Sequence, residues 1–226
     1  MLARTQVLTF HGIGDPIVPL AEGEGRYFVP SDTYRRTIRS LGEYEARHKV
    51  HLTVTFDDGN LSDYAVGLPA LVEAGRSAMF AILAGRIDRH GYLSGSQIRD
   101  MLSAGMTIAT HGYDHVDWRR LDEAGRQREL YDARRKIEDE AGQAVTEAAI
   151  PFGAFDRSVL HELKAAGYTR VYTSTSGLSL DGSWFCPRWS VTEDFDPDRD
   201  MASRLSLKEV IRSTAFAALR RARYRI

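Results

Sequence analysis

The sequence predicts a single α/β domain built from repeated strand–helix units on a parallel sheet. Three observations lead to this fold class. The chain has 226 residues, which suits one domain of the larger kind. Short apolar segments alternate with helical patterns, and a glycine ends several of those patterns. We count about seven units with no linker rich in Pro, Gly or Ser between them, so a closed or nearly closed barrel is the most economical arrangement and an open doubly wound sheet is the second.

The glycines mark where helices end. Glycine tolerates the left-handed conformation that often closes a helix. Four glycines share one context, after an alanine and before a short apolar run: Gly75, Gly105, Gly142 and Gly167. The order helix, glycine, strand is typical of parallel βα units.

The expected strands are short segments rich in apolar residues. In chain order they cover residues 6–10, 51–56, 78–83, 106–109, 148–151, 171–173 and 184–187. Ser31, Ser62 and either Ser94 or Ser96 precede helical patterns and are N-cap residue types. The helix expected over 122–141 is long and heavily charged, so we place it on the outside.

Composition excludes several classes of protein. Lys and Arg number 30 against 31 Asp and Glu, so nucleic acid is not an expected partner. The one cysteine, Cys186, excludes an internal disulfide and a Cys-rich zinc site. No apolar stretch approaches the roughly 18 residues of a membrane span. Residues 1–10 are too polar for a secretory leader, so we expect a cytoplasmic protein with no signal peptide, with membrane association through its tail as the alternative.

Charge is distributed unevenly along the chain. Residues 201–226 carry seven basic side chains and the acid Glu209, which gives +6 and leaves −7 for residues 1–200. We therefore divide the chain into a barrel over 1–200 and a basic C-terminal helix or tail over 201–226. One side of that helix would carry Leu207, Val210, Ile211, Ala215 and Ala218. We expect this side to pack on the barrel; the alternative is docking on an anionic membrane or a synthase partner.

Two carboxylates follow one of the expected strands. Active sites of parallel barrels form at the C-terminal ends of the strands. Residues 55–59 read Thr-Phe-Asp-Asp-Gly, which places Asp57 and Asp58 at such an end. Adjacent side chains of an extended segment point to opposite faces, so the two acids share a site only where a cation draws them in or water solvates them. The plain alternative is a polar turn, because Asp-Gly is a common turn pair.

Two histidines follow another strand. His111 and His115 are four residues apart, so on a helical turn they would share one face and could bind one metal, although such a pair also arises by chance. Both polar clusters follow strands of a parallel sheet and therefore lie on one rim. One aspartate and two histidines form a facial set of ligands that leaves positions open for water and substrate.

Three motifs in this order resemble those of the polysaccharide deacetylases, the NodB-homology group known as carbohydrate esterase family 4. They are residues 55–59, the run His-Gly-Tyr-Asp-His at 111–115, and Pro-Phe-Gly at 151–153. The resemblance covers about residues 5–191. It implies a distorted (β/α)7 catalytic barrel, a divalent metal that is often zinc, and hydrolysis of an acetamide or an acetate ester on a sugar.

The resemblance also implies roles by position. Asp58, His111 and His115 would bind the metal, and Asp57 would be the general base for the attacking water. The resemblance makes Zn²⁺ the first choice of metal, and Co²⁺, Ni²⁺ and Mn²⁺ are alternatives that also suit one carboxylate and two imidazoles.

Substrate contacts are expected around the third motif. A backbone N–H near Phe152 would help hold the oxyanion, an effect of about 3 kcal/mol per donor. Gly153 suits a turn that exposes this amide. Tyr113 and Trp189 complete the candidate substrate contacts. Tryptophan faces commonly stack on sugars, and packing is the equal alternative for Trp189.

The sequence also departs from the family pattern. Gly112 stands where the family has Ser or Thr, which we expect to remove a supporting hydroxyl but not the metal. Residues 148–150 lack the Arg that precedes the third motif, and residues 172–176 replace an acidic and Trp segment. No histidine follows His161, so the late His that supplies the general acid is missing. These gaps resemble a divergent branch that acts in surface and extracellular polysaccharide synthesis.

Two residues could compensate for these gaps. Arg188, past the last strand, is the candidate cation that keeps Asp57 ionised; an ordinary surface arginine is the alternative. His11 ends the first strand on the same rim and could return the proton to the leaving amine, although a lone histidine is more often structural.

We therefore expect a metal-dependent deacetylase that acts on an acetylated glycan, first on the N-acetyl group of a GlcNAc-type residue in exopolysaccharide biosynthesis. Two alternatives stay open. One is a related metal-dependent amidase that acts on a small cyclic amide. The other is a glycan-binding barrel without catalysis, which the missing late histidine would fit.

Overall fold

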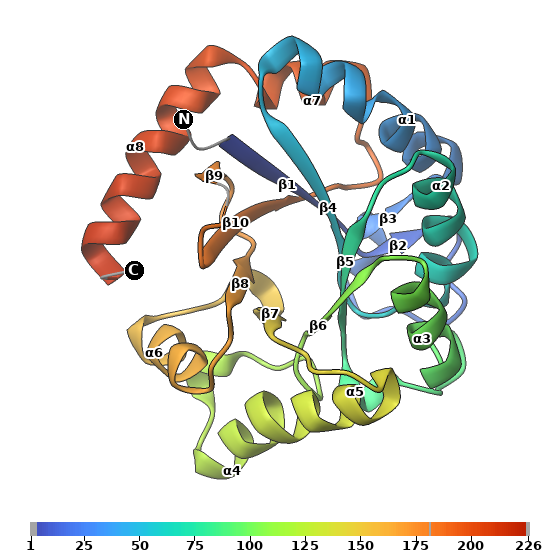
Figure 1. Ribbon diagram of the computed structural model, residues 1–226, viewed down its shortest axis with the longest axis vertical. Coiled ribbons are helices and arrows are strands. Elements are labelled where there is room, and N and C mark those ends of the chain that lie inside the picture. The colour runs from blue at the N-terminus through green and yellow to red at the C-terminus, as the bar shows by residue number, and fades with distance from the viewer. Residues whose placement is uncertain (1–3, 181, 225–226) are drawn as a thin grey trace.

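Seven parallel strands close into a barrel (Figure 1). The computed structural model describes residues 4–180 and 182–224, apart from the side chains at positions 207, 210, 218 and 220–222. The barrel strands are β1 (Arg4–Phe10), β4 (His51–Phe56), β5 (Ala78–Ile82), β6 (Thr107–Thr110), β7 (Glu147–Ala149), β8 (Arg170–Thr173) and β10 (Phe185–Ser190). β10 pairs with β1 in the register Val7↔Arg188, which closes the ring. The predicted (β/α)7 barrel is confirmed, and the open sheet is excluded.

Helices surround the strands (Figure 1). They are α1 (Ser31–His48), α2 (Leu68–Glu73), α3 (Gly95–Ser103), α4 (Glu123–Arg126), α5 (Ala133–Ala141), α6 (Arg157–Ala165), α7 (Pro197–Arg204) and α8 (Leu207–Tyr224). Ser94 caps α3 in a capping box with Gln97, as its residue type predicted. The four glycines that were expected to end helices have φ between 62° and 81°. A π-helical run, Gln127–Asp132, joins α4 to α5 and completes the helix expected over 122–141.

Three short strands were not predicted. β2 (Gly12–Ile13) and β3 (Phe28–Val29) pair with each other inside the long loop after β1, and β9 (Ser179–Leu180) adds antiparallel to the start of β1. Two residues are too few to show an alternating pattern, so such strands form only where tertiary neighbours offer partners.

The inward face of the strands carries several small side chains together with the larger Tyr172. Ala81, Ala109 and Ala149 lie inside the narrow barrel with Val7 and Met79. The outward face carries the larger apolar residues, which pack under the helices. There Phe56 stacks on Phe80 at 4.6 Å between ring centroids, and Phe10 meets Tyr34 edge to face at 5.0 Å. Cys186 is 5% exposed, as the sequence suggested.

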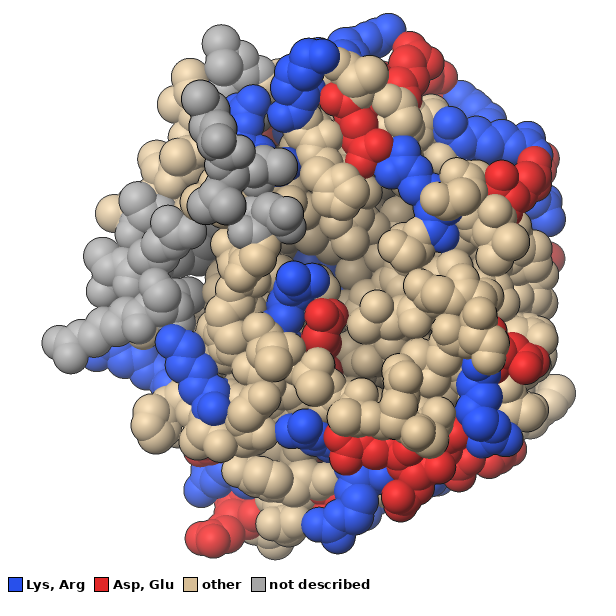
Figure 2. Space-filling view, viewed as in Figure 1, with Lys and Arg blue, Asp and Glu red and all other residues tan. Residues whose placement is uncertain are grey.

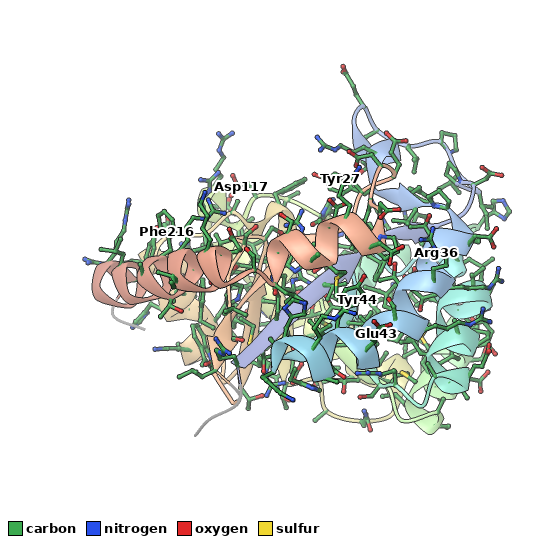
Figure 3. All side chains as sticks on the ribbon, turned by 90° about the horizontal axis from the view of Figure 1, so that it is seen from above. Tyr27, Arg36, Glu43, Tyr44, Asp117 and Phe216 are labelled. Atoms are coloured by element: carbon green, nitrogen blue, oxygen red, sulfur yellow. The ribbon has the colours of Figure 1, made fainter. Side chains whose placement is uncertain are left out.

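The C-terminal helices close the outer ring. α7 packs on α1, where Tyr44 donates to the Pro197 carbonyl (3.1 Å) and Arg36 pairs with Asp198 (2.9 Å). α7 itself spans the expected boundary between residues 200 and 201, and that division stays a prediction. In Figure 3, Phe216 marks α8 at the end of the molecule opposite Arg36.

α8 meets the barrel through a different side from the expected one. Ser213 is buried, and the Tyr224 ring lies 5.1 Å from that of Phe155. These residues are eleven apart, which is close to three full turns, so they share one side. Ile211 is 62% exposed and Ala215 is exposed, and the packing expected for these two is therefore wrong. Leu207, Val210 and Ala218, also expected on that side, have side chains outside the described part.

Charges of both signs are interspersed around the edge of the face in Figure 2, in keeping with the near-zero net charge. Among the helices in the described part of the chain, none has the length and apolar character needed to cross a bilayer.

The aromatic cluster should be a main source of stability. Phe80→Ala removes a fully buried ring and leaves a cavity, so it should lower the free energy of unfolding by about 3–5 kcal/mol in urea denaturation. Val72→Ala, at a side chain 54% exposed on α2, is the control and should change it by less than about 0.5 kcal/mol. Equal effects of the two substitutions would contradict the packing described above.

Candidate metal and catalytic site

The alternation of β4 directs Asp57 into the barrel. Val54 and Phe56 face outward into the core, whereas Thr55 faces inward and meets Thr9 of β1 (3.0 Å between hydroxyl oxygens). The Asp57 N–H continues the ladder by donating to the Phe10 carbonyl (2.9 Å). Asp57 therefore occupies the next inward position, at the C-terminal end of the barrel.

Arg188 of β10 binds Asp57 with both ends of its guanidinium. Nη1 donates to Oδ1 and Nη2 to Oδ2, each at 2.7 Å, and Nη1 also contacts the Thr55 hydroxyl (3.2 Å). Both side chains are almost fully buried. Burial raises the pKa of Asp57, but Arg188 and His111 outweigh burial and hold this pKa below its ordinary value. Arg188 is thus the cation that two adjacent carboxylates at one site require, and not an ordinary surface arginine.

Asp58 reaches the same cavity by a change of backbone conformation. Its φ of 78° is left-handed, so its side chain does not follow the outward direction of a strand. Oδ1 of Asp58 lies 3.8 Å from Nε2 of His111 and 3.7 Å from Nε2 of His115. Within the described residues this buried oxygen has no hydrogen-bond partner.

His111 is prepared as a neutral ligand. Nδ1 lies 2.8 Å from the Ala149 carbonyl, which can only accept, so Nδ1 carries the hydrogen and Nε2 keeps its lone pair. Burial lowers the pKa of His111 to about 3. Burial also lowers the pKa of His115, and the positive charge of Arg86 is the second cause of this lowering.

His115 comes into place without a helix. Residues 111–117 contain no helix, only a bend at residues 113 and 114, and His115 has a φ of 58°. The helical turn expected from the spacing of the two histidines is therefore wrong, although the two rings do approach to 5.1 Å. The left-handed conformation of His115, instead of a helical turn, brings its ring close to the ring of His111.

These three side chains fit a divalent metal. Their candidate ligand atoms all lie within 4.8 Å of one another. Two neutral imidazole nitrogens and one carboxylate oxygen, which has no hydrogen bond among the described residues and only a 3.6 Å ion pair with Arg86, form a donor set that suits zinc and related ions. Asp57 stays outside this set because Arg188 occupies both of its oxygens.

A cavity of about 160 Å³ opens in front of the site. Its wall includes residues that the sequence analysis did not single out: Glu24, Tyr27, Arg86 and Tyr92. Figure 3 shows Tyr27, from the loop after β1, on the same upper side as Asp117, from the loop after β6. Arg86 follows β5 as Asp58 follows β4, so the strand-end rule could have found it. Glu24 and Tyr27 belong to an irregular loop that carries no periodic signal.

His11 and Phe152 also line the cavity. Nδ1 of His11 is buried without a hydrogen-bond partner in the described part, and its ring lies 4.8 Å from that of Tyr27. Phe152 sits in a 3-10 turn with a φ of 58°, and its exposed ring lies 4.4 Å from that of His115. Gly153 shapes this turn, because its N–H donates to the Ile150 carbonyl and a Cβ there would lie 2.5 Å from Ser174 N.

Two candidate substrate contacts lie elsewhere. Trp189 is only 2% exposed, packs on Phe195 and is covered by the Arg204 guanidinium at 4.0 Å. Its neighbour Arg188 points into the barrel, so alternation turns Trp189 into the core, and packing rather than sugar stacking describes it. Tyr113 does not line the cavity; Arg128 covers its ring at 3.8 Å.

Comparison with known proteins identifies the family. The sequence model of the family described as polysaccharide deacetylase matches residues 44–171. The homologue YxkH of Bacillus subtilis (strain 168) is 26% identical over 126 residues, which cover 56% of this chain and 45% of that protein. This chain therefore spans a little under half of that relative's length.

Solved structures share the fold. BC0361, a polysaccharide deacetylase from Bacillus cereus, superposes with a TM-score of 0.76 at 21% identity, over 91% of this chain and 70% of that one. PplD, a deacetylase of Streptococcus pyogenes, superposes with a TM-score of 0.74 at 18% identity, over 89% and 98%. Since the family match alone covers more than half of the sequence, this chain belongs to the polysaccharide deacetylase family.

Proposed function

We propose that the protein is a metal-dependent hydrolase that removes acetyl groups from a poly- or oligosaccharide, first the N-acetyl group of a GlcNAc-type residue, in exopolysaccharide biosynthesis. Family membership supports carbohydrate deacetylation. The observation that carries the proposal is the separation of two neighbouring carboxylates. Asp57 is paired with Arg188, whereas Asp58 lies beside His111 and His115.

Asp58, His111 and His115 would hold the metal, zinc first among the candidates. When bound, a divalent metal supplies Lewis acidity, which lowers the pKa of a coordinated water and polarises the acetyl carbonyl. Asp57 would accept the proton of the attacking water. Its Oδ2 lies 3.9 Å from Nε2 of His111, and this short distance to a proposed ligand supports the role of Asp57 as the base.

Residues that line the cavity are the candidates for the general acid, the oxyanion donor and the contacts with the sugar. His11, with its buried Nδ1, would donate a proton to the leaving amine. The Phe152 N–H is the candidate oxyanion donor, because the Gly153 N–H is already engaged within the turn. Phe152, Tyr27 and Tyr92 offer aromatic surface to a sugar ring.

One experiment separates this proposal from its alternatives. Zinc content and acetate release from chito-oligosaccharides would be measured on the same preparation. Zinc with acetate release supports the deacetylase. Zinc without acetate from any acetylated glycan favours the cyclic amidase or the glycan-binding barrel, and a protein that binds no divalent metal removes the proposal.

Asp57→Asn should separate catalysis from metal binding. The substitution removes the proton acceptor but no proposed metal ligand, so acetate release should fall by at least about 100-fold while the zinc Kd changes little. Isothermal titration with Zn²⁺ and an acetate assay measure the two quantities. Asp139→Asn, at an exposed carboxylate on α5, is the control. Wild-type turnover in Asp57→Asn would remove Asp57 as the base.

Arg188→Met should move the pH profile of deacetylation. Arg188 lowers the pKa of Asp57, so its loss raises this pKa, and the ionised base then disappears at a higher pH. The acidic limb of kcat/KM should therefore shift upward. Breaking a buried ion pair also costs about 3–5 kcal/mol of stability, so the assay should run where urea titration shows a folded protein. An unmoved acidic limb would contradict the role given to Arg188.

We also propose that α8 contacts an anionic membrane surface. Ile211, Phe216 and Leu219 are exposed by 62%, 52% and 65%, and the basic residues Lys208 and Arg212 share this outward side. Apolar and basic side chains on one helix face suit adsorption to acidic lipid. A synthase partner is the alternative.

Vesicle flotation tests this contact. The wild-type chain should float with vesicles that contain phosphatidylglycerol and stay behind with pure phosphatidylcholine. Exchange of Ile211, Phe216 and Leu219 for serine should abolish flotation. The control, Val72→Ser on α2, should float like the wild type. Equal flotation of the triple variant, or none by the wild type, would dismiss the membrane in favour of a protein partner.

A further inference from the structure

A buried carboxylate lies behind the loop that carries both histidines. Glu129 belongs to the π-helical run Gln127–Asp132 and is 1% exposed. Its Oε2 accepts hydrogen bonds from the Tyr113 N–H (2.8 Å) and from Nε1 of Trp118 (3.4 Å), and its Oε1 accepts one from the Asp114 N–H (2.9 Å). All three partners are donors, so the site is built for an acceptor.

Gly112 makes room for this carboxylate. Its φ is 89°, and a Cβ at this position would lie 2.3 Å from Oε2 of Glu129 and 3.2 Å from the Trp118 ring. The absence of a side chain at Gly112 was expected to remove a supporting hydroxyl. In the folded chain, the space is taken by Glu129, which supports the loop through its backbone instead.

The loop depends on such support because it has no helix of its own. Residues 111–117 are irregular apart from a bend at residues 113 and 114, and His115 is held in the left-handed region. Glu129 fixes two backbone N–H groups in the middle of this loop, between the two histidines. Arg128, its neighbour, pairs with Asp114 and covers the Tyr113 ring. Widened π-turns of this kind often occur at functional sites.

We infer that Glu129 is a positioning residue that sets the separation and orientation of His111 and His115 through the backbone between them. The inference rests on the metal site proposed above. Groups that orient metal ligands from outside typically change metal affinity by about 10–100-fold when they are removed.

Zinc affinity of the apoprotein provides the test. Glu129→Gln keeps the shape of the side chain but turns an N–H₂ group toward donors, so the zinc Kd should rise by about 10–100-fold. Glu129→Asp is the second variant, for use if Glu129→Gln does not fold. It keeps the charge but is one methylene shorter, so it should also raise the zinc Kd. The control is Asp139→Asn on α5, the helix that follows the π-helical run, and it should leave the zinc Kd unchanged.

Thermal unfolding with and without zinc separates positioning from plain stability. A merely structural Glu129 would lower the apo Tm but leave the zinc Kd within about twofold of wild type, and that result in a folded variant overturns the inference. If the wild type itself binds no zinc, the proposed function fails first. If wild type and variants bind zinc equally, only the role of Glu129 fails.

Discussion

The buried pair between Asp57 and Arg188 is the interaction on which the site depends. It forms across the seam that closes the barrel, because β10 pairs with β1 and β1 pairs with β4. Removing two charges from water is costly unless they form well-aligned hydrogen bonds. Here Nη1 donates to Oδ1 and Nη2 donates to Oδ2, each at 2.7 Å. The pair gives the two adjacent acids different environments. One carboxylate is held by two short hydrogen bonds to a buried cation, whereas Oδ1 of the other has no hydrogen-bond partner among the described residues and lies 3.6 Å from Nη1 of Arg86.

Left-handed backbone places three other groups around the cavity. Asp58, His115 and Phe152 are non-glycine residues with φ of 78°, 58° and 58°. Such conformations cost roughly 1–3 kcal/mol each and persist only where the surroundings enforce them. Each of the three follows the end of a parallel strand, where the barrel holds the chain on one side. The rigid barrel thus supports a rim whose backbone would not adopt these conformations alone.

The sequence predicted the barrel because its signals are local. A glycine after a helix and an apolar run after that glycine predicted four of the seven barrel strands, and the other three were predicted from short segments rich in apolar residues. Active sites of parallel barrels form at the C-terminal ends of the strands, and this rule singled out Asp57, Asp58, His111 and His115. It did not single out Glu24 and Tyr27 of the cavity wall, since they lie in a loop whose shape depends on pairing between β2 and β3. Glu129 was missed for a related reason. It lies on a charged helix surface in the sequence, and only the fold turns it inward toward Tyr113.

Two departures from the family pattern can be understood from residues that are near in the fold but distant in the sequence. The third motif lacks its arginine, and the run that stands there, residues 148–150, includes Ala149, a small residue inside the barrel. Arg188 enters the same interior from β10 and lies 5.5 Å from the Tyr172 ring of the neighbouring strand. A cation supplied from another strand can therefore pair with the carboxylate of Asp57. Gly112 and Glu129 form a second exchange of this type, because a side chain is lost at the loop and a buried acceptor gains its place. In both cases a side chain from another part of the chain makes a contact at the incomplete motif: Arg188 pairs with Asp57, and Glu129 accepts a hydrogen bond from the backbone of the histidine loop.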